Sequence, residues 1–239
     1  MSGITLLGAG MSQPPSGAAT DPNWASVVLL AVNDNAGDAT TTFIDQSTSA
    51  KTITAVGNVQ YDTAQAPTGM TSSALFDGTG DRLTLAANGD FTMGTGDVTW
   101  EGFVRFASVA SSGFICAGDS VDGDNWFIVY NNSLLAFRFG FNDVASAYNE
   151  SWTPSADTWY HWALCRSGNS WRSFIDGTQV GSTRTDAGNL QTSDATVAIG
   201  AFNDGVFTLN GWHCSVRVTK GVARYTANFT PPTLPLPTS

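Results

Sequence analysis

Residues 159–182 read WYHWALCRSGNSWRSFIDGTQVGS, and within this stretch strand-forming runs alternate with tight-turn signals. WYHWALCR (159–166) and WRSFI (171–175) are rich in aromatic residues, which favour strands. The link SGNS (167–170) holds Gly and Asn, and Asp176-Gly177 follows the second run. Asp-Gly between two such runs is the strongest short signal for a β-hairpin. The stretch therefore predicts three antiparallel strands joined by two hairpins.

The same alternation of strand-like runs and turn signals extends over the rest of the chain. Turn signals recur about every 8–12 residues, a spacing typical of antiparallel sandwiches and barrels. The link Asn131–Ser133 predicts a further tight hairpin, because Asn tolerates positive φ. No helix longer than two turns is expected. The strand-like runs occupy residues 27–32, 52–56, 74–76, 82–85, 98–106, 113–118, 125–131, 134–141, 195–200 and 209–218.

The run VTWEGFVRF (98–106) shows which side chains share a face, since successive residues of a strand point to opposite sides. Glu101 and Arg105 fall on the same face and are expected to pair diagonally. The continuous apolar run VVLLAV (27–32) predicts a strand covered on both faces. One face of the 98–106 strand holds Val98, Trp100, Gly102, Val104 and Phe106, and the other holds Thr99, Glu101, Phe103 and Arg105.

The composition excludes several classes of protein. Glu101 and Glu150 are the only glutamates, and Lys51 and Lys220 are the only lysines, so the residues that build solvated helices are scarce. The formal net charge is −10, which argues against nucleic-acid partners because phosphate is repelled. A hydrophobic content of 42% is enough for a folded core. No apolar run reaches the roughly 18–20 residues that cross a bilayer, so no membrane partner is expected.

The two ends of the chain differ in composition from the middle. Residues 1–22 are rich in Gly, Ser, Pro and Ala and hold no charge before Asp21, which predicts an extended N-terminal arm. We expect Ile4, Leu6 and Leu7 to be its attachment contacts, and we expect no secretory signal, because no basic segment precedes this apolar patch. Residues 23–230 are predicted to form one domain, and the Pro-rich residues 231–239 an extended tail.

The three cysteines predict buried free thiols. Cys116, Cys165 and Cys214 are odd in number and far apart, which suits neither a disulfide scaffold nor a zinc site. Each lies within an apolar or aromatic run, where Cys behaves as a small apolar residue. A protein with free thiols is expected to fold in a reducing cytoplasm.

Three groups of segments carry a resemblance to a known family. Together they resemble the laminin-G-like, concanavalin-A-like jelly-roll domains, and the last of them resembles the versions found in virion proteins of tailed bacteriophages. The likeness covers roughly residues 24–235. The segments are FDGTGDRL (76–83) leading through Phe91 to GTGDVTWEG (94–102), then TWYHWAL (158–164) with FIDGTQVG (174–181), and VRVTKGVARYTANFTPP (216–232).

The resemblance implies an all-β fold in which two antiparallel sheets pack face to face as a jelly-roll sandwich, one of them concave. It also implies protein or glycan binding, a place on the virion surface and, only rarely, catalysis. Some relatives bind calcium and carry an acidic pair where this chain has Cys214 and Ser215, which weakens a transferred calcium site. The partners implied are major capsid or tail proteins, a host surface glycan and further copies of the chain; a trimer is one arrangement found on phage capsids.

Catalytic candidates are few. A glycosidase needs two carboxylates flanking the scissile bond. The next positions on the face of Glu101 hold Phe103 and Arg105, which are not acids. Glu150 is predicted to lie in a loop. Both glutamates are therefore expected to be solvated or salt-bridged. His161 is expected to be a satisfied structural histidine, and His213 alternates faces with Trp212 and Cys214.

The calcium candidate is the acidic stretch 118–125. Asp119, Asp122, Asp124 and Asn125 offer oxygen ligands of the kind that Ca²⁺ takes. The spacing is not that of an EF-hand, and an ordinary Asp/Gly turn explains the stretch as well. The shorter stretch 33–38 is a second candidate of the same kind. Apart from this possible Ca²⁺, no cofactor is expected.

Aromatic residues next to turns are the candidates for glycan binding. Most tryptophans fall within strands, where core packing is the default. Trp126, Trp152 and Trp171 lie beside turns and are expected to be better exposed. In the segment 216–232, Tyr225 and Phe229 are expected to pack on the sandwich and hold the C-terminal part of the chain against it. Arg224 is expected to pair with an Asp.

The sequence therefore predicts a non-enzymatic virion surface protein, a capsid decoration or a component of a fibre or tail. Its N-terminal arm would attach it to the particle, and its domain would face outward and contact host glycans. One alternative is a glycan-binding adhesion module. Another is a polysaccharide depolymerase with Glu101 and Glu150 as its catalytic pair.

Overall fold

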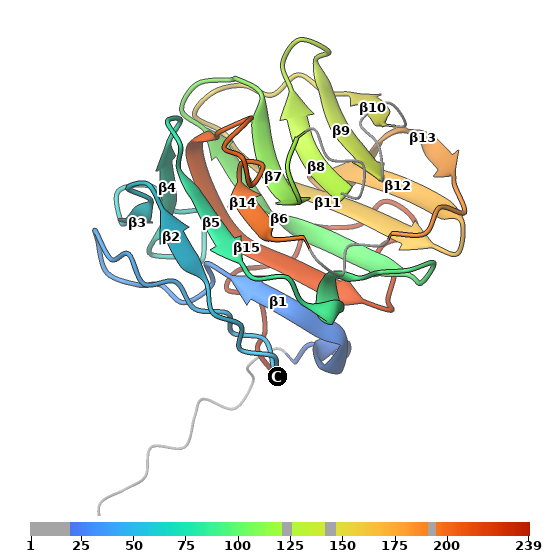
Figure 1. The fold of residues 1–239 in the computed structure, drawn as a ribbon, viewed down its shortest axis with the longest axis horizontal. Coiled ribbons are helices and arrows are strands. Elements are labelled where there is room, and N and C mark those ends of the chain that lie inside the picture. The colour runs from blue at the N-terminus through green and yellow to red at the C-terminus, as the bar shows by residue number, and fades with distance from the viewer. Residues whose placement is uncertain (1–19, 121–125, 142–146, 191–194) are drawn as a thin grey trace, which may run out of the picture.

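A computed structural model describes residues 20–120, 126–141, 147–190 and 195–239. Two antiparallel sheets pack face to face as a sandwich (Figure 1). The predicted all-β, two-sheet architecture is confirmed. The helices of the described residues are single 3₁₀ turns at Trp24–Ser26 and Gly89–Phe91, and none of them could span a membrane.

The eight-stranded sheet is built around β15, the longest strand. The first part of β15 pairs with β4, and its second part pairs with β1 on the same side, after an irregularity between Cys214 and Arg217. In spatial order the sheet contains β13 (Thr178–Thr185), β12 (Ser170–Ile175), β11 (Trp159–Ser167), β6 (Val98–Phe106), β15 (Asn210–Lys220), β4 (Ser73–Asp77) and β3 (Gln60–Asp62), with β1 (Val27–Ala31) beside β15.

The seven-stranded sheet packs against it through apolar side chains. Neighbouring strands of this sheet are antiparallel throughout. In spatial order it contains β10 (Tyr148–Ser151), β9 (Ala136–Phe141), β8 (Trp126–Asn131), β7 (Ser112–Ala117), β14 (Val197–Gly200), β5 (Arg82–Leu85) and β2 (Thr54–Val56).

The hairpins predicted from 159–182 are confirmed, whereas the one at 131–133 is shifted. Asp176 and Gly177 both have positive φ, 48° and 74°, as a two-residue hairpin turn requires. Between β8 and β9 the turn extends to Leu135, whose φ is 47°, so β9 begins only at Ala136. The predicted strand start at residue 134 is therefore wrong, and Leu134 and Leu135 are half exposed in the turn.

The core lies between the sheets, and the alternation along β6 decides which side chains enter it. Trp100 is buried there, with its ring centroid 5.2 Å from that of Trp126 and 6.2 Å from that of Trp171. Aromatic rings of this size bury the most apolar area per residue, and offset pairs add to that stabilisation. Alternation divides β6 into two faces, and the face with Val98, Trp100, Val104 and Phe106 is the one that enters the core.

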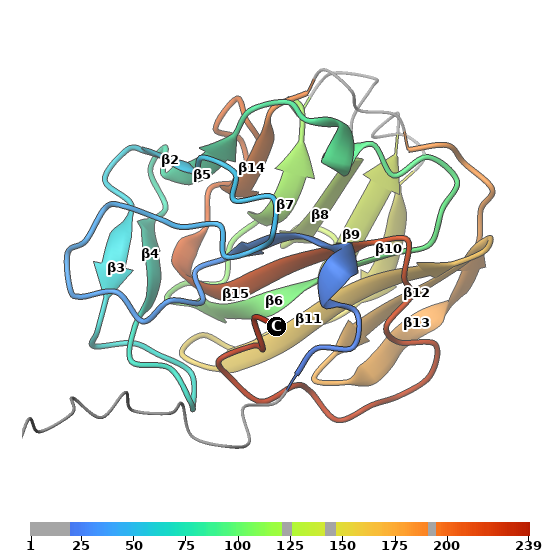
Figure 2. The ribbon, with the colours of Figure 1, turned by 90° about the horizontal axis from the view of Figure 1, so that it is seen from below.

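The outer face of the eight-stranded sheet is crossed by both ends of the described chain (Figure 2). We call residues 221–236 the C-terminal strap. Its Leu236 is buried against Val27 and Leu30 of β1, which are covered on this side as the sequence predicts. The backbone N–H of Asp21 donates to Ser239 O at 2.7 Å. The Pro-rich end thus packs on the sandwich, and the folded body begins before residue 23.

Candidate functional site

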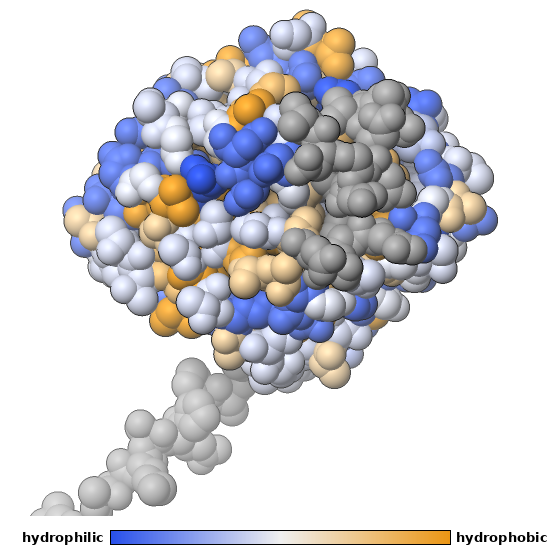
Figure 3. Space-filling model, in the orientation of Figure 1, coloured by the Kyte–Doolittle hydropathy of each residue, from blue (hydrophilic) through white to orange (hydrophobic). Residues whose placement is uncertain are grey.

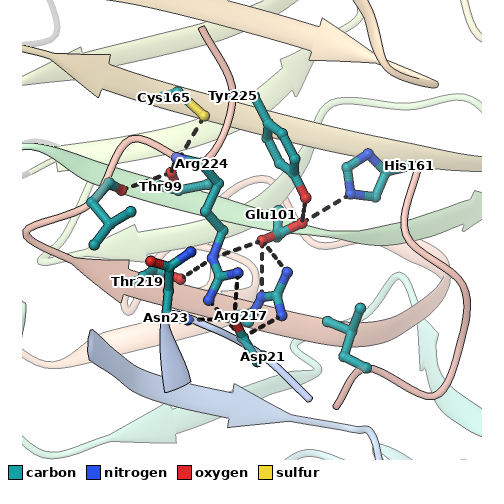
Figure 4. Close-up of polar contacts among 12 residues, drawn as sticks. Asp21, Asn23, Thr99, Glu101, His161, Cys165, Arg217, Thr219, Arg224 and Tyr225 are labelled. Carbon is teal, nitrogen blue, oxygen red and sulfur yellow. Dashed lines mark hydrogen bonds and ion pairs between the residues drawn. The ribbon is translucent and has the colours of Figure 1, made fainter. Parts of the chain in front are cut away.

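A buried polar network lies on the outer face of the eight-stranded sheet (Figure 4). Glu101 of β6 stands directly opposite Arg217 of β15 in the strand pairing. Arg217 donates to Glu101 Oε1 from Nε at 2.9 Å and approaches it with Nη2 at 2.7 Å. The other carboxylate oxygen, Oε2, accepts from the Tyr225 hydroxyl at 2.8 Å and lies 3.2 Å from His161 Nε2. Every oxygen of this buried carboxylate is thereby satisfied.

A second carboxylate and a second guanidinium complete the network. Arg224 binds Asp21 with both terminal nitrogens, at 3.0 and 2.7 Å, and Arg217 Nη1 reaches Asp21 Oδ2 at 3.1 Å. The predicted pairing of Arg224 with an Asp is confirmed. Two acids thus balance two arginines in a region closed to solvent, which limits the cost of burying each charge.

The charges of this network are fixed near neutral pH. Burial alone would raise the pKa of Glu101, but Arg217, His161 and Arg224 lower it to about 2. Burial also opposes ionisation of Asp21, yet the hydrogen bonds from Arg224 and from the Asn23 backbone hold its pKa below the usual value. A carboxylate held ionised in this way has no proton to give, so Glu101 is unsuited to general acid catalysis.

Other ion pairs differ from what the sequence predicts. The diagonal pairing of Glu101 with Arg105 is wrong, because Arg105 binds Asp157 at 2.8 Å and lies over the Trp212 ring. Glu150 is in β10 rather than in a loop, and Arg184 Nε donates to it at 2.6 Å. The two glutamates, both buried and salt-bridged, belong to different sheets.

A groove of about 510 Å³ opens beside the network. Its floor includes Phe103 of β6 with Trp159 and His161 of β11, and the exposed Asp176 lies at its edge. Residues 67–69 and 231–234 form its walls. The volume falls within the range of small-molecule sites, which combine apolar walls with a few polar groups.

His161 belongs both to the network and to the groove. Its Nε2 faces Glu101, whereas its Nδ1 is buried without a hydrogen-bond partner among the residues that the structure describes. The expectation of a satisfied structural histidine therefore holds for one ring nitrogen only. The His161 backbone N–H donates to Asp176 Oδ1 at 2.8 Å, and the Asp176 N–H donates back to His161 O at 2.8 Å.

The C-terminal strap is held by stacked aromatic rings. Tyr225 and Phe229 lie 3.5 Å apart between ring centroids, at an interplanar angle of 4°. Both pack on a small buried cluster formed by Ala163, Cys165 and Phe174. Phe229 N–H also donates to Gly177 O at 2.9 Å. The prediction that these two rings hold the C-terminal segment against the sandwich is confirmed. The strap that they hold forms one wall of the groove.

The tryptophans predicted to be exposed do not form a site. Trp126 and Trp171 are buried in the core at 1% and 0% exposure, so the expectation that turn neighbours would be accessible is wrong for both. Trp152 is partly buried and packs against Tyr160 and Tyr130. Trp159, which is also partly buried, lines the groove instead. Period two along 159–166 gives the signal for it, because Trp159 and His161 lie on the face opposite the buried Trp162.

The remaining titratable candidates are structural. His213 is buried among aromatic rings, and burial lowers its pKa to about 4. The three cysteines are free and buried, as predicted. Burial raises the pKa of the Cys165 and Cys214 thiols to about 12. Thiols with such a pKa are not reactive nucleophiles.

The calcium and arm candidates fall mostly outside the described residues. Asp119 accepts from the Asn203 side chain at 2.9 Å, as in an ordinary loop. Within the described ranges, no three His, Cys, Asp or Glu side chains gather as a metal site would require. The residues that lie outside the described ranges are Asp122, Asp124, Asn125, Ile4, Leu6 and Leu7.

The face over the seven-stranded sheet has a different character. Figure 3 shows hydrophobic side chains there in small separate groups among hydrophilic ones, over the part that is coloured. Scattered apolar residues of this kind are normal on a protein surface. The aromatic groove is on the other sheet, and we take it as the candidate site.

Several solved structures of low sequence identity share this fold. The binding domain of Paraclostridial mosquitocidal protein 1 matches with a TM-score of 0.62 and 10% identity, over 83% of this chain and 50% of that one. The binding domain of botulinum neurotoxin serotype D gives 0.59 and 14%, over 85% and 50%. The chain thus spans about half of these toxin domains. Domain 4 of an extracellular arabinanase from Geobacillus stearothermophilus gives 0.60 and 14%, over 83% and 95%.

A family match connects the sequence to this fold. No curated protein matches the chain in sequence. Residues 77–223, more than half of the chain, match the laminin-G-like family described as the concanavalin A-like lectin/glucanases superfamily. The match begins at the FDGTG segment and ends just before Arg224. The chain therefore belongs to the concanavalin A-like lectin/glucanases superfamily, as a laminin-G-like domain.

Proposed function

We propose that this protein is a non-catalytic glycan-binding module carried on the surface of a tailed-phage particle. The observation that carries the binding role is the groove beside β6 and β11, where Trp159 and Phe103 offer aromatic surface and Asp176 a polar edge. Mostly apolar pockets with a few convergent polar groups are the usual form of ligand sites.

The distribution of carboxylates supports binding rather than hydrolysis. Glycosidases place two carboxyl groups about 5–9.5 Å apart across the bond that they cleave. Asp176 is the one acid among the residues that line the groove. Glu101 and Glu150, on different sheets, are each held by arginine.

The neighbours in fold support the same function. Domain 4 of the arabinanase was solved in complex with arabinotriose, and the toxin neighbours are described as binding domains. A sandwich of this family that displays an aromatic groove suits the same kind of ligand. Host-surface glycans are therefore the partners that we propose for the groove.

A glycan array probed with the full-length chain tests this function. We expect binding to a subset of surface glycans, with calcium and with chelator in parallel. We also expect no new reducing ends when the bound polysaccharide is incubated with the protein, because Asp176 is the one acid among the described residues that line the groove. Absence of binding at high glycan density would refute the binding role, and release of reducing ends would refute the non-catalytic role.

The virion part of the proposal rests on the strap segment. Gly221–Tyr225 and Phe229–Pro232 resemble the phage-type members of the family, and Tyr225 and Phe229 anchor the strap. The uncharged residues 1–20 would attach the domain to a capsid or tail protein, or to sister subunits in a homo-oligomer such as a trimer. The displayed sandwich would then face outward with its net negative surface.

Deletion of residues 1–19 tests the attachment. The deletion must stop there, because Asp21 binds Arg217 and Arg224 in the buried network. We expect the truncated chain to unfold at the same denaturant concentration as the full chain but to be missing from purified particles by mass spectrometry. The triple change Ile4→Ser, Leu6→Ser and Leu7→Ser is the matched full-length variant, with the same expected loss. Truncated chains that still enter particles would contradict the attachment role.

A further inference from the structure

We propose that the groove binds a neutral hexopyranose, stacked on Trp159 with a hydroxyl donating to the exposed Asp176 carboxylate, and that it rejects acidic sugars. This inference rests on the proposed glycan-binding function. It adds the place, the orientation and the charge class of the ligand.

The floor of the groove is aromatic because two neighbouring strands present their outer faces there. His161 of β11 stands opposite Phe103 of β6, and Trp159 lies two residues before His161 on the same face. Trp159 and Phe103 are only partly buried, so part of each ring remains accessible. The apolar C–H face of a pyranose packs on such rings, and Pro231 and Pro232 add apolar surface from the wall.

The polar edge of the groove is a hydrogen-bond acceptor. His161 lines the groove, but its side chain is 1% exposed and its Nε2 faces Glu101, so the imidazole closes the floor and does not contact ligand hydroxyls. The exposed acceptor is the Asp176 carboxylate.

Asp176 supplies this acceptor at the edge of the groove. Its Oδ1 accepts the His161 backbone N–H, and its backbone N–H is bonded to His161 O, so the two residues hold each other in place. Its exposed carboxylate forms no ion pair with a described Arg or Lys. Carboxylates commonly bind sugar hydroxyls, which donate to both oxygens in the way that other donors do.

Charge decides between ligand classes. An acidic sugar would bring its carboxylate or sulfate next to Asp176 on a protein of net charge −10, which is unfavourable. A polybasic peptide or a divalent cation would need several anionic ligands, but Asp176 is the one acid of the lining. Uncharged hydroxyl donors fit the Asp176 carboxylate.

The test compares three variants of the full chain on arrays that hold matched neutral and sialylated or sulfated glycans. Trp159→Ala is expected to weaken binding of the neutral ligand about tenfold or more, by removing the stacking surface. Trp212→Ala is the matched control: Trp212 is a partly buried tryptophan on the same sheet that is not part of the groove lining, and this variant is expected to bind as the unchanged protein does.

Asp176→Asn tests the charge. Asn tolerates the positive φ of this turn and keeps an oxygen for the His161 N–H, so the hairpin should remain intact. We expect the ratio of acidic to neutral glycan binding to rise about tenfold, because the like charge is gone. Equal denaturation midpoints for all the variants exclude unfolding as the cause.

The outcomes separate this inference from the function on which it rests. If the unchanged protein binds no glycan, the proposed function fails. If it binds glycans but Trp159→Ala binds equally well, the site lies elsewhere and only this inference is overturned. It is also overturned if acidic glycans bind the unchanged protein as tightly as neutral ones, or if a lysine-rich peptide displaces the glycan.

Discussion

Replacing Arg217 with Met is expected to lower the free energy of unfolding by about 3–5 kcal/mol. Arg217 contacts Glu101 at 2.7 and 2.9 Å and Asp21 at 3.1 Å, and both carboxylates are shielded from water. Without it, two buried negative charges share the single guanidinium of Arg224. Urea denaturation of the full chain at neutral pH measures the loss.

Two companion variants show whether the loss comes from buried charge. Arg105→Met removes an arginine of the same sheet face whose partner, Asp157, is 71% exposed, and is expected to cost about 1 kcal/mol or less. The double variant Arg217→Met with Glu101→Gln should lose less than Arg217→Met alone, because it also removes the stranded charge and leaves Tyr225 and His161 a partner. Equal losses for Arg217→Met and Arg105→Met would contradict this explanation.

Strand alternation was enough to predict which side chains of β6 share a face, because the period of a strand is independent of its partners. It was not enough to predict the network. The pairing of Glu101 with Arg217 depends on the register between β6 and β15, which are far apart in the sequence, and on the irregularity between Cys214 and Arg217. Arg105 was the nearer candidate in sequence, but it is bound by Asp157 instead.

Which tryptophans are exposed at the candidate site also depends on contacts between segments that are far apart in the sequence. Trp171 follows a turn, which favours exposure, yet its ring packs within the core against Phe141 and Trp100. Whether a turn neighbour is covered depends on where the opposite sheet ends, and local sequence does not carry that information. Trp159 is accessible because it faces away from the sandwich at the start of β11, where the strap leaves the groove open.

Gly177 is the residue that lets the C-terminal strap approach the eight-stranded sheet. A Cβ at this position would lie 1.9 Å from Phe229 O and 3.1 Å from Pro231 Cδ, and φ at Gly177 is 74°. The Phe229 N–H bond to Gly177 O, at 2.9 Å, requires this close approach. A side chain here must therefore push the strap away.

Gly177→Ala is accordingly expected to cost about 3 kcal/mol, from the strained backbone and the displaced strap together. Gly168→Ala is the matched control, because Gly168 also lies in a hairpin turn with positive φ, 58°, but a Cβ there meets nothing within 4 Å. It should cost about 1 kcal/mol, from backbone strain alone.

Thiol labelling distinguishes movement of the strap from general loss of stability. Cys165 lies beneath Tyr225 and Phe229, whereas Cys116 and Cys214 are buried elsewhere. In native conditions Gly177→Ala should speed the labelling of Cys165 relative to the other two thiols, since displacing the strap uncovers Cys165 first. Gly168→Ala should leave that ratio unchanged. If the two variants label Cys165 at the same relative rate, the strap does not depend on Gly177, and the groove wall must be held by the Tyr225 and Phe229 rings alone.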